Sequence, residues 1–111
     1  MIEPKLQRND EAKPVEMLPG IVRRTLNHGA NTSIHEIRMD AGAIVPDHTH
    51  PHEQTGYLVS GRILFEMPGT TLELGPGDSW LVPGEVHHKV TALEPSIAVD
   101  IFSPVREDYL D

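Results

Sequence analysis

The stretch His48-Thr-His50-Pro-His-Glu53-Gln54 holds the densest group of polar side chains in the sequence. His48 and His50 are two residues apart, and alternate side chains of an extended strand point to the same side. Two neutral imidazoles that point to the same side can bind one metal ion. By the same alternation Gln54 joins the pair and Glu53 points away. The stretch therefore predicts a metal site on a β-strand.

A further histidine, His88, follows the turn Pro83-Gly84 later in the chain. It shares one face of an expected strand with Val86 and Val90, whose apolar side chains belong in the interior. A histidine on an apolar face is most often a hydrogen-bonded core residue. The histidine pair upstream favours the other interpretation, in which His88 is a third metal ligand.

The rest of the chain alternates between apolar and polar residues over short runs. The nine glycines and ten prolines are spread along the chain, and the longest stretch free of both is Ala30–Ala41. Within that stretch His35, Ile37 and Met39 lie on one face, which is the period of a strand. The same period recurs in residues 62–67, 70–74, 86–92 and 97–101. Short strands separated by Gly/Pro turns predict an all-β sandwich or barrel.

Length and composition exclude several classes of protein. The chain has 111 residues, enough for one domain. With 17 acidic and 9 basic residues its net charge is −8, which argues against a nucleic-acid partner. The absence of cysteine excludes disulfide scaffolds and thiol catalysis. No apolar run approaches the ~20 residues of a membrane span, and Met1–Lys5 does not resemble a signal peptide, so we expect a cytoplasmic protein without a membrane partner.

The N-terminal residues differ from the rest of the chain. Residues 3–14 are rich in charge and show little periodicity. Two interpretations of residues 1–18 are open: a mobile arm, or an edge strand completed by a partner subunit. Residues 19–111 are expected to form a single barrel domain with a short C-terminal tail. The apolar face of residues 97–101 needs cover, which predicts a homodimer.

The spacing of the glycines and histidines resembles the two motifs of the cupins. Gly42-x5-His48-x-His50-x3-Gln54-x6-Gly61 is similar to the first motif, G-x5-H-x-H-x3,4-E-x6-G, and Gly77-x5-Pro83-x4-His88 is similar to the second, G-x5-P-x-G-x2-H. The strand pattern extends the likeness from about residue 19 to residue 104. The resemblance implies a cupin double-stranded β-helix, a jelly-roll-like barrel with a divalent metal inside its open end.

The sequence departs from the cupin pattern in two places. Gln54 stands where the family has glutamate, and Gly84 lies one position before the glycine of the second motif. Three imidazoles and an amide leave the charge of a divalent ion uncompensated, which favours Lewis-acid chemistry. An oxygen-activating iron site uses two histidines and a carboxylate. A dioxygenase acting on a small organic acid therefore remains only as an alternative, with Glu53 as the carboxylate if a bulge near Pro51 reverses the alternation.

Two segments carry a narrower resemblance, to the pectin-degradation-protein cupins. These are His48–Tyr57 and Asp100–Leu110, the latter reading D-I-F-S-P-V-R-E-D-Y-L. The resemblance implies that Gln54 is the fourth metal ligand beside the three histidines. It also implies that 4,5-unsaturated monouronates from pectin or alginate breakdown are converted to linear keto forms. We expect one divalent metal ion, with nickel, zinc, iron, manganese and cobalt all open, and a small anionic sugar acid as the partner.

The expected reaction suggests roles for three further residues. Asp100 shares a strand face with Phe102, and we expect it to be the general acid/base. Arg106 is expected to bind the substrate carboxylate, and Phe102 to form a pocket wall. The plainer alternatives are that Asp100 is an ordinary strand carboxylate, Arg106 a surface charge and Phe102 a core residue. A non-catalytic cupin that binds a sugar acid also remains open.

The remaining histidines and the tryptophan are expected to serve the structure. His28 and His35 are predicted to be structural, and His87 to face away from its neighbour. His52 is left out of the ligand set as a surface residue or a neighbour of the site. Trp80 is expected to pack in the core or line the cavity.

Overall fold

The structure is a computed structural model that describes residues 2–111, so Met1 of the predicted N-terminal segment lies outside the described residues. Ten strands and two short 3-10 turns make up its regular structure. The elements are η1 (Asn9–Glu11), β1 (Pro14–Leu18), β2 (Ile21–His28), β3 (Ser33–Met39), β4 (Ile44–His48), β5 (Glu53–Ser60), β6 (Ile63–Met67), β7 (Thr70–Leu74), β8 (Ser79–Val82), β9 (His88–Ala92), β10 (Ser96–Ser103) and η2 (Glu107–Tyr109). The predicted all-β class is confirmed.

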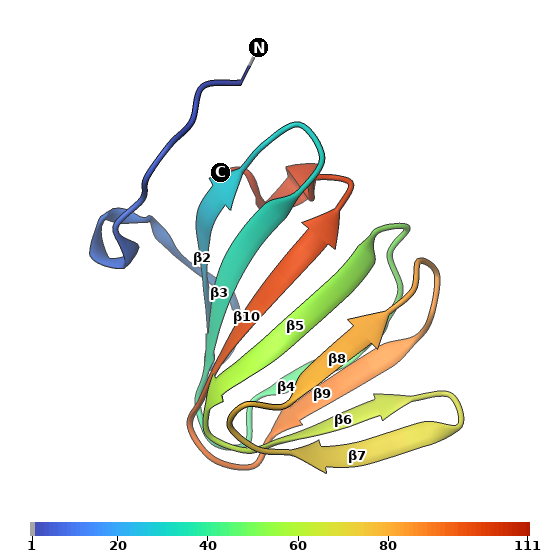
Figure 1. Cartoon of the computed structure of the whole chain (residues 1–111). Coiled ribbons are helices and arrows are strands. Elements are labelled where there is room, and N and C mark those ends of the chain that lie inside the picture. Colours follow the sequence, from blue (N-terminus) through green and yellow to red (C-terminus); the bar gives the residue numbers. More distant parts are fainter. Residues whose placement is uncertain (1) are drawn as a thin grey trace.

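The strands form two antiparallel sheets that lie against each other as two layers (Figure 1). The larger sheet has the order β1-β2-β3-β10-β5-β8, and the smaller one has the order β4-β9-β6-β7. Strand β10, near the end of the chain, lies between β3 and β5. This crossing order brings residues that are far apart in sequence onto neighbouring strands.

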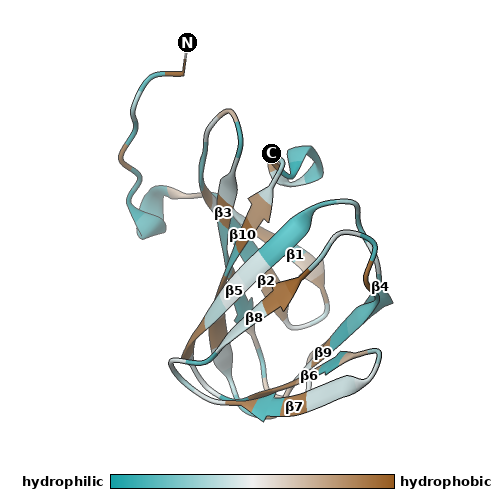
Figure 2. Ribbon diagram, turned by 45° about the vertical axis from the view of Figure 1, so that its right-hand side comes forward, coloured by the Kyte–Doolittle hydropathy of each residue, from teal (hydrophilic) through white to brown (hydrophobic). Residues whose placement is uncertain are grey.

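The core lies between the two sheets. Along the strands apolar and polar residues follow one another (Figure 2), so each strand sends one face inward. The predicted alternating runs coincide with β3, β6, β7, β9 and β10. The most deeply buried apolar side chains of the core include Ile21, Leu58, Ile63, Val82 and Ala92.

Strand β1 pairs with β2 of the same chain and forms one edge of the larger sheet. Its register sets Val15 opposite Arg23 and Glu16 opposite Val22. This part of the N-terminal segment is thus an edge strand whose partner is within the chain. The division into residues 1–18 and a barrel of residues 19–111 stays a prediction.

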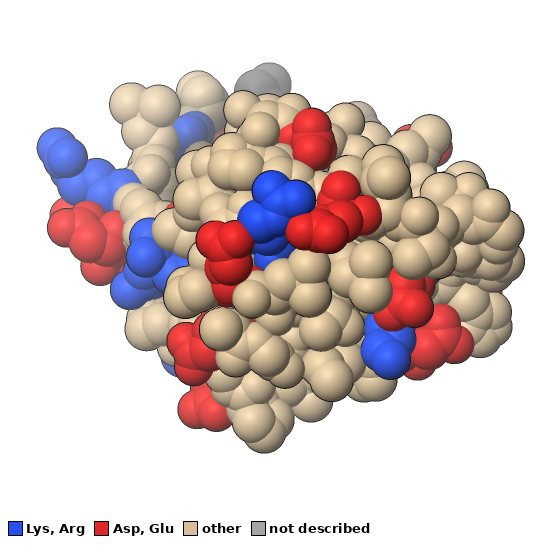
Figure 3. All heavy atoms as spheres, turned by 90° about the horizontal axis from the view of Figure 1, so that it is seen from below, with Lys and Arg blue, Asp and Glu red and all other residues tan. Residues whose placement is uncertain are grey.

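The surface shows how the negative charge is distributed. On the face seen in Figure 3, acidic side chains lie singly or in small groups with basic side chains nearby. Exposed pairs such as Arg62 with Glu73, 2.7 Å apart, are screened by water and contribute little to stability. Charge alone therefore does not locate a functional site. Among residues 2–111 there is no helix with the length and apolar character needed to span a bilayer.

Candidate metal centre

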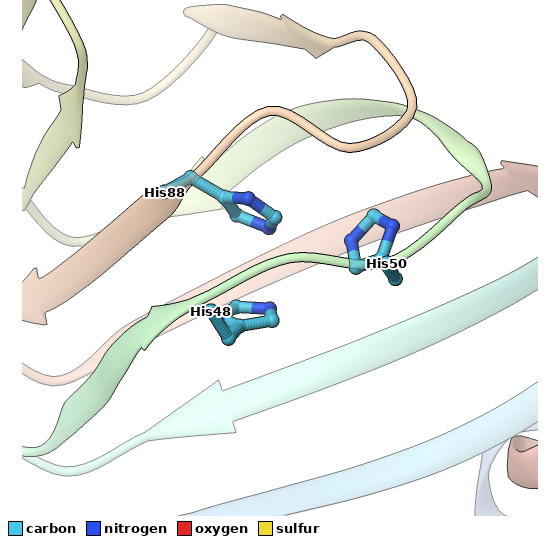
Figure 4. A group of neighbouring side chains, drawn as sticks. All are labelled: His48, His50 and His88. Atoms are coloured by element: carbon cyan, nitrogen blue, oxygen red, sulfur yellow. The ribbon is translucent and has the colours of Figure 1, made fainter.

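Three histidines converge inside one end of the two-layered fold. His48 is the last residue of β4 and stands opposite His88, the first residue of β9. His50 follows in the connection between β4 and β5. Figure 4 shows the three rings directed toward one another, and one ring nitrogen of each lies within 4.8 Å of the others. The structure differs from the single-strand expectation, because β4 ends at His48 and His50 is held by a loop instead.

Each of these rings is fixed by a hydrogen bond from its other nitrogen. The three Nδ1 atoms donate to backbone carbonyl oxygens two residues away, His48 to Pro46 at 2.9 Å, His50 to His52 at 3.1 Å and His88 to Val86 at 2.9 Å. A neutral imidazole that donates from Nδ1 keeps a lone pair on Nε2. The backbone therefore sets the tautomer that a metal ligand requires.

Burial favours the neutral form of two of these imidazoles, those of His50 and His88. It lowers the pKa of His88 from 6.5 to about 4 and lowers the pKa of His50 as well. The Nε2 atom of His88 is buried and has no hydrogen-bond partner among the described residues. A buried polar atom without a partner is costly unless a ligand satisfies it. The donor set thus fits a divalent metal ion, and the three histidines can bind one.

Gln54 on β5 completes the cluster. Its side chain is buried, and its Oε1 lies 2.9 Å from His50 Nε2. Its Nε2 donates to Asp100 Oδ1 at 2.8 Å, which orients the amide. Two atoms with lone pairs then face each other, an arrangement that a shared cation relieves. Glu53, the alternative carboxylate ligand, is exposed on the other side of β5.

Asp100 lies in β10 beside this cluster. Its Oδ1 accepts hydrogen bonds from Gln54 and from Trp80 Nε1, the latter at 2.9 Å. Burial raises the pKa of this carboxyl above its ordinary value. Asp100 also lines a pocket of about 80 Å³ together with His48, Gln54, His88, Phe102, Arg106 and Tyr109. The pocket therefore brings together six of the seven residues predicted for the site. The seventh, His50, does not line it but contacts Gln54, which does.

One wall of the pocket comes from the end of β10 and the C-terminal segment. The guanidinium carbon of Arg106 lies 4.0 Å from the Tyr109 ring centre and 4.9 Å from that of Phe102. The Arg106 side chain is only 12% exposed, and its Nε is 3.2 Å from Asp108. Arg106 is thus a cation held on aromatic faces beside the pocket rather than a solvated surface charge.

The turn before His88 holds the loop that carries His50. The backbone N–H of Glu85 donates to the His50 carbonyl at 2.8 Å. Glu85 has φ +68°, the left-handed conformation that glycine adopts most readily, at the position where the cupin motif has its glycine. Gly84 is needed for a different reason, because a Cβ there would lie 2.5 Å from the Pro51 carbonyl oxygen. The departure from the motif thus keeps a glycine where two backbone segments meet.

The other histidines lie outside the ligand cluster. His87 is exposed and its Nδ1 is 2.9 Å from Asp47. His35 is fully buried and hydrogen-bonded on both nitrogens, to Thr25 and Ser33. Sequence reasoning missed Tyr109 as part of the pocket wall and Trp80 as a donor to Asp100.

The family model described as a cupin domain matches residues 35–102. The chain belongs to the cupin family. That residue range contains all four predicted metal ligands, the strands β4 to β9 and most of β3 and β10. The predicted cupin double-stranded β-helix is therefore confirmed.

Individual relatives narrow the resemblance. The chain is 31% identical over 104 residues to the pectin degradation protein KdgF of Dickeya dadantii, covering 92% of this chain and 94% of that protein. It is also similar to the structure of KdgF from Halomonas sp., with a TM-score of 0.92, 34% identity and coverage of 97% and 100%. An RmlC-like cupin from Shewanella frigidimarina matches with a TM-score of 0.92, 29% identity and 97% coverage of each chain. The predicted likeness to the pectin-degradation-protein cupins is confirmed.

Proposed function

We propose that this cupin converts 4,5-unsaturated monouronates into linear keto forms at a divalent metal held by His48, His50, Gln54 and His88. The observation that carries the proposal is the placement of Asp100 and Arg106 in one pocket with three of those ligands, His48, Gln54 and His88. The likeness to KdgF, a pectin degradation protein, supports a sugar acid from pectin as the substrate.

The donor set suits Lewis-acid chemistry. Four neutral side chains leave the charge of a divalent ion available to an anionic oxygen. When bound, the metal supplies stabilisation of negative charge on a substrate oxygen. The choice among nickel, zinc, iron, manganese and cobalt depends on geometry and supply.

Arg106 and Phe102 hold the substrate in this proposal. The guanidinium offers paired N–H donors, which match the two oxygens of a uronate carboxylate. The contact of Arg106 with two aromatic rings limits the positions that its head can take. Phe102, 2% exposed, gives the sugar a flat apolar wall.

Asp100 moves the proton. As the base it takes the proton of the C1 hydroxyl, so that the C1 carbonyl forms and the bond from C1 to the ring oxygen breaks. The electron pair of that bond stays on the ring oxygen as an enolate. Asp100 then returns the proton to C4, which leaves a keto group at C5 and no net change in atoms.

The test is turnover of unsaturated galacturonate followed by the loss of its ultraviolet absorbance, compared with the spontaneous rate. We expect metal-loaded protein to accelerate the loss, and His88→Ala to abolish both acceleration and metal binding. His87→Ala is the matched control, because the neighbouring ring is exposed and outside the site. Acceleration that survives in His88→Ala would contradict the proposal.

Two other features remain predictions. The homodimer rests on the apolar outer face of β10, which includes the 39% exposed Ile101. The cytoplasmic location rests on sequence composition alone.

A further inference from the structure

Two donors meet at one oxygen of Asp100. Trp80 Nε1 donates to Oδ1 at 2.9 Å and Gln54 Nε2 donates to the same atom at 2.8 Å. No residue among 2–111 donates a hydrogen bond to the other oxygen, Oδ2. Two hydrogen bonds to Oδ1 hold the carboxylate in one orientation. Oδ2 is therefore the oxygen left for proton transfer in the pocket.

The indole reaches Asp100 by crossing a glycine. Trp80 in β8 stands opposite Gly56 in β5, and Gly56 stands opposite Asp100 in β10. A Cβ on Gly56 would lie 2.0 Å from the indole atoms Cε2 and Nε1. Only the missing side chain at position 56 therefore lets the indole lie across β5 with its N–H at Asp100.

The rest of the indole packs as an ordinary core residue. Trp80 is 7% exposed, and its ring centre lies 5.3 Å from that of Phe65. A phenyl ring at position 80 would keep most of this apolar contact but has no N–H. The packing role and the hydrogen-bonding role can therefore be separated by substitution.

We propose that Trp80 is a positioning residue that, across Gly56, fixes which oxygen of Asp100 faces the substrate. The catalytic part rests on the proposed function of Asp100, whereas the hydrogen bond itself does not. The Gln54 amide keeps its own hydrogen bond to the same oxygen, and its Oε1 faces His50.

The hydrogen bond is tested first without any turnover. Trp80 is the only tryptophan, so a nitrogen-15 correlation spectrum has a single indole N–H signal to follow. We expect Asp100→Ala and Gly56→Ala each to shift that signal, because the first removes the acceptor and the second displaces the ring. Leu81→Ala, which changes the exposed next residue of β8, is the control and is expected to leave it in place. An indole signal that does not move in Asp100→Ala overturns the proposal.

Kinetics test the positioning role. Trp80→Phe is expected to lower kcat about tenfold, with KM and bound metal unchanged, as for loss of one hydrogen bond to a charged group. In an Asp100→Asn background the same substitution is expected to cause no further loss, because Trp80 acts through Asp100. An equal loss in both backgrounds, or a change in KM or metal content alone, overturns the positioning role. Absence of turnover in the unmodified protein overturns the proposed function and the catalytic part together, while the indole signal still decides the contact.

Discussion

His35 is the centre of a hydrogen-bond chain that ties the C-terminal segment to the larger sheet. The backbone N–H of Arg106 donates to Ser33 Oγ at 3.1 Å, and the Ser33 hydroxyl donates to His35 Nε2 at 2.8 Å. His35 Nδ1 donates to Thr25 Oγ1 at 2.9 Å. The Thr25 hydroxyl in turn donates to the Tyr109 carbonyl at 2.5 Å. Each donor finds an acceptor only if the imidazole is neutral, and Arg106 and Tyr109 line the pocket.

Protonation of His35 is therefore expected to destabilise the fold. Burial, followed by the charge of Arg23, lowers the pKa of His35 from 6.5 to about 4. The other charged groups that act on the ring are Arg106 and His28, which lower the pKa, and Asp108, which raises it. Between the two values the unfolded chain binds the proton and the folded chain does not, so stability falls as the pH falls. A difference of about 2.5 at about 1.4 kcal/mol per pKa unit gives about 3 kcal/mol.

The measurement is the free energy of unfolding by denaturant at about pH 7 and about pH 4, for the metal-free protein and for His35→Gln. The unmodified protein is expected to lose about 3 kcal/mol more than the variant between these pH values, because the other titrating groups are common to both. If the variant is too unstable to compare, an NMR titration of the His35 ring in the folded protein decides the matter. Equal losses, or a ring that titrates near its ordinary pKa, would refute the reasoning.

Three further predictions concern the site and the assembly. Gly84→Ala is expected to weaken metal binding about tenfold, as measured by calorimetry, because the added Cβ would collide with the Pro51 carbonyl and shift the loop that carries His50. An unchanged metal affinity would argue against that contact. Arg106→Met, which keeps the length but not the charge, is expected to raise KM for the uronate at least about tenfold with bound metal unchanged; an unaltered KM would remove Arg106 from substrate binding. Light scattering is expected to give twice the mass of the chain, and the mass of a single chain would contradict the homodimer.

Much of the fold could be predicted because strand periodicity is a local property of the sequence. The alternation of His35, Ile37 and Met39 identified β3, and that of residues 97–101 identified β10. The inward face of His88 followed from its apolar neighbour Val90, which is buried beside it. Such patterns arise whenever one face of a strand is buried and the other is exposed to solvent.

The contacts around Asp100 could not be predicted, because they depend on strand order. Trp80, Gly56 and Asp100 lie in one row only because β5 separates β8 from β10. The contact of Tyr109 with Arg106 depends on how the segment after β10 folds back, which no short-range pattern specifies. The loop position of His50 was missed because alternation was extended past the end of β4, into a segment that contains Pro51.

The central claim is that Asp100 transfers the proton at a metal-loaded site. The most direct measurement is the turnover of unsaturated galacturonate by Asp100→Asn, with bound metal determined in the same sample. Asparagine keeps an oxygen that can accept from Gln54 and Trp80, so the metal site is expected to remain. The account predicts full metal content and a fall in kcat of about a hundredfold or more. Turnover close to that of the unmodified protein, with metal bound in both, would contradict it.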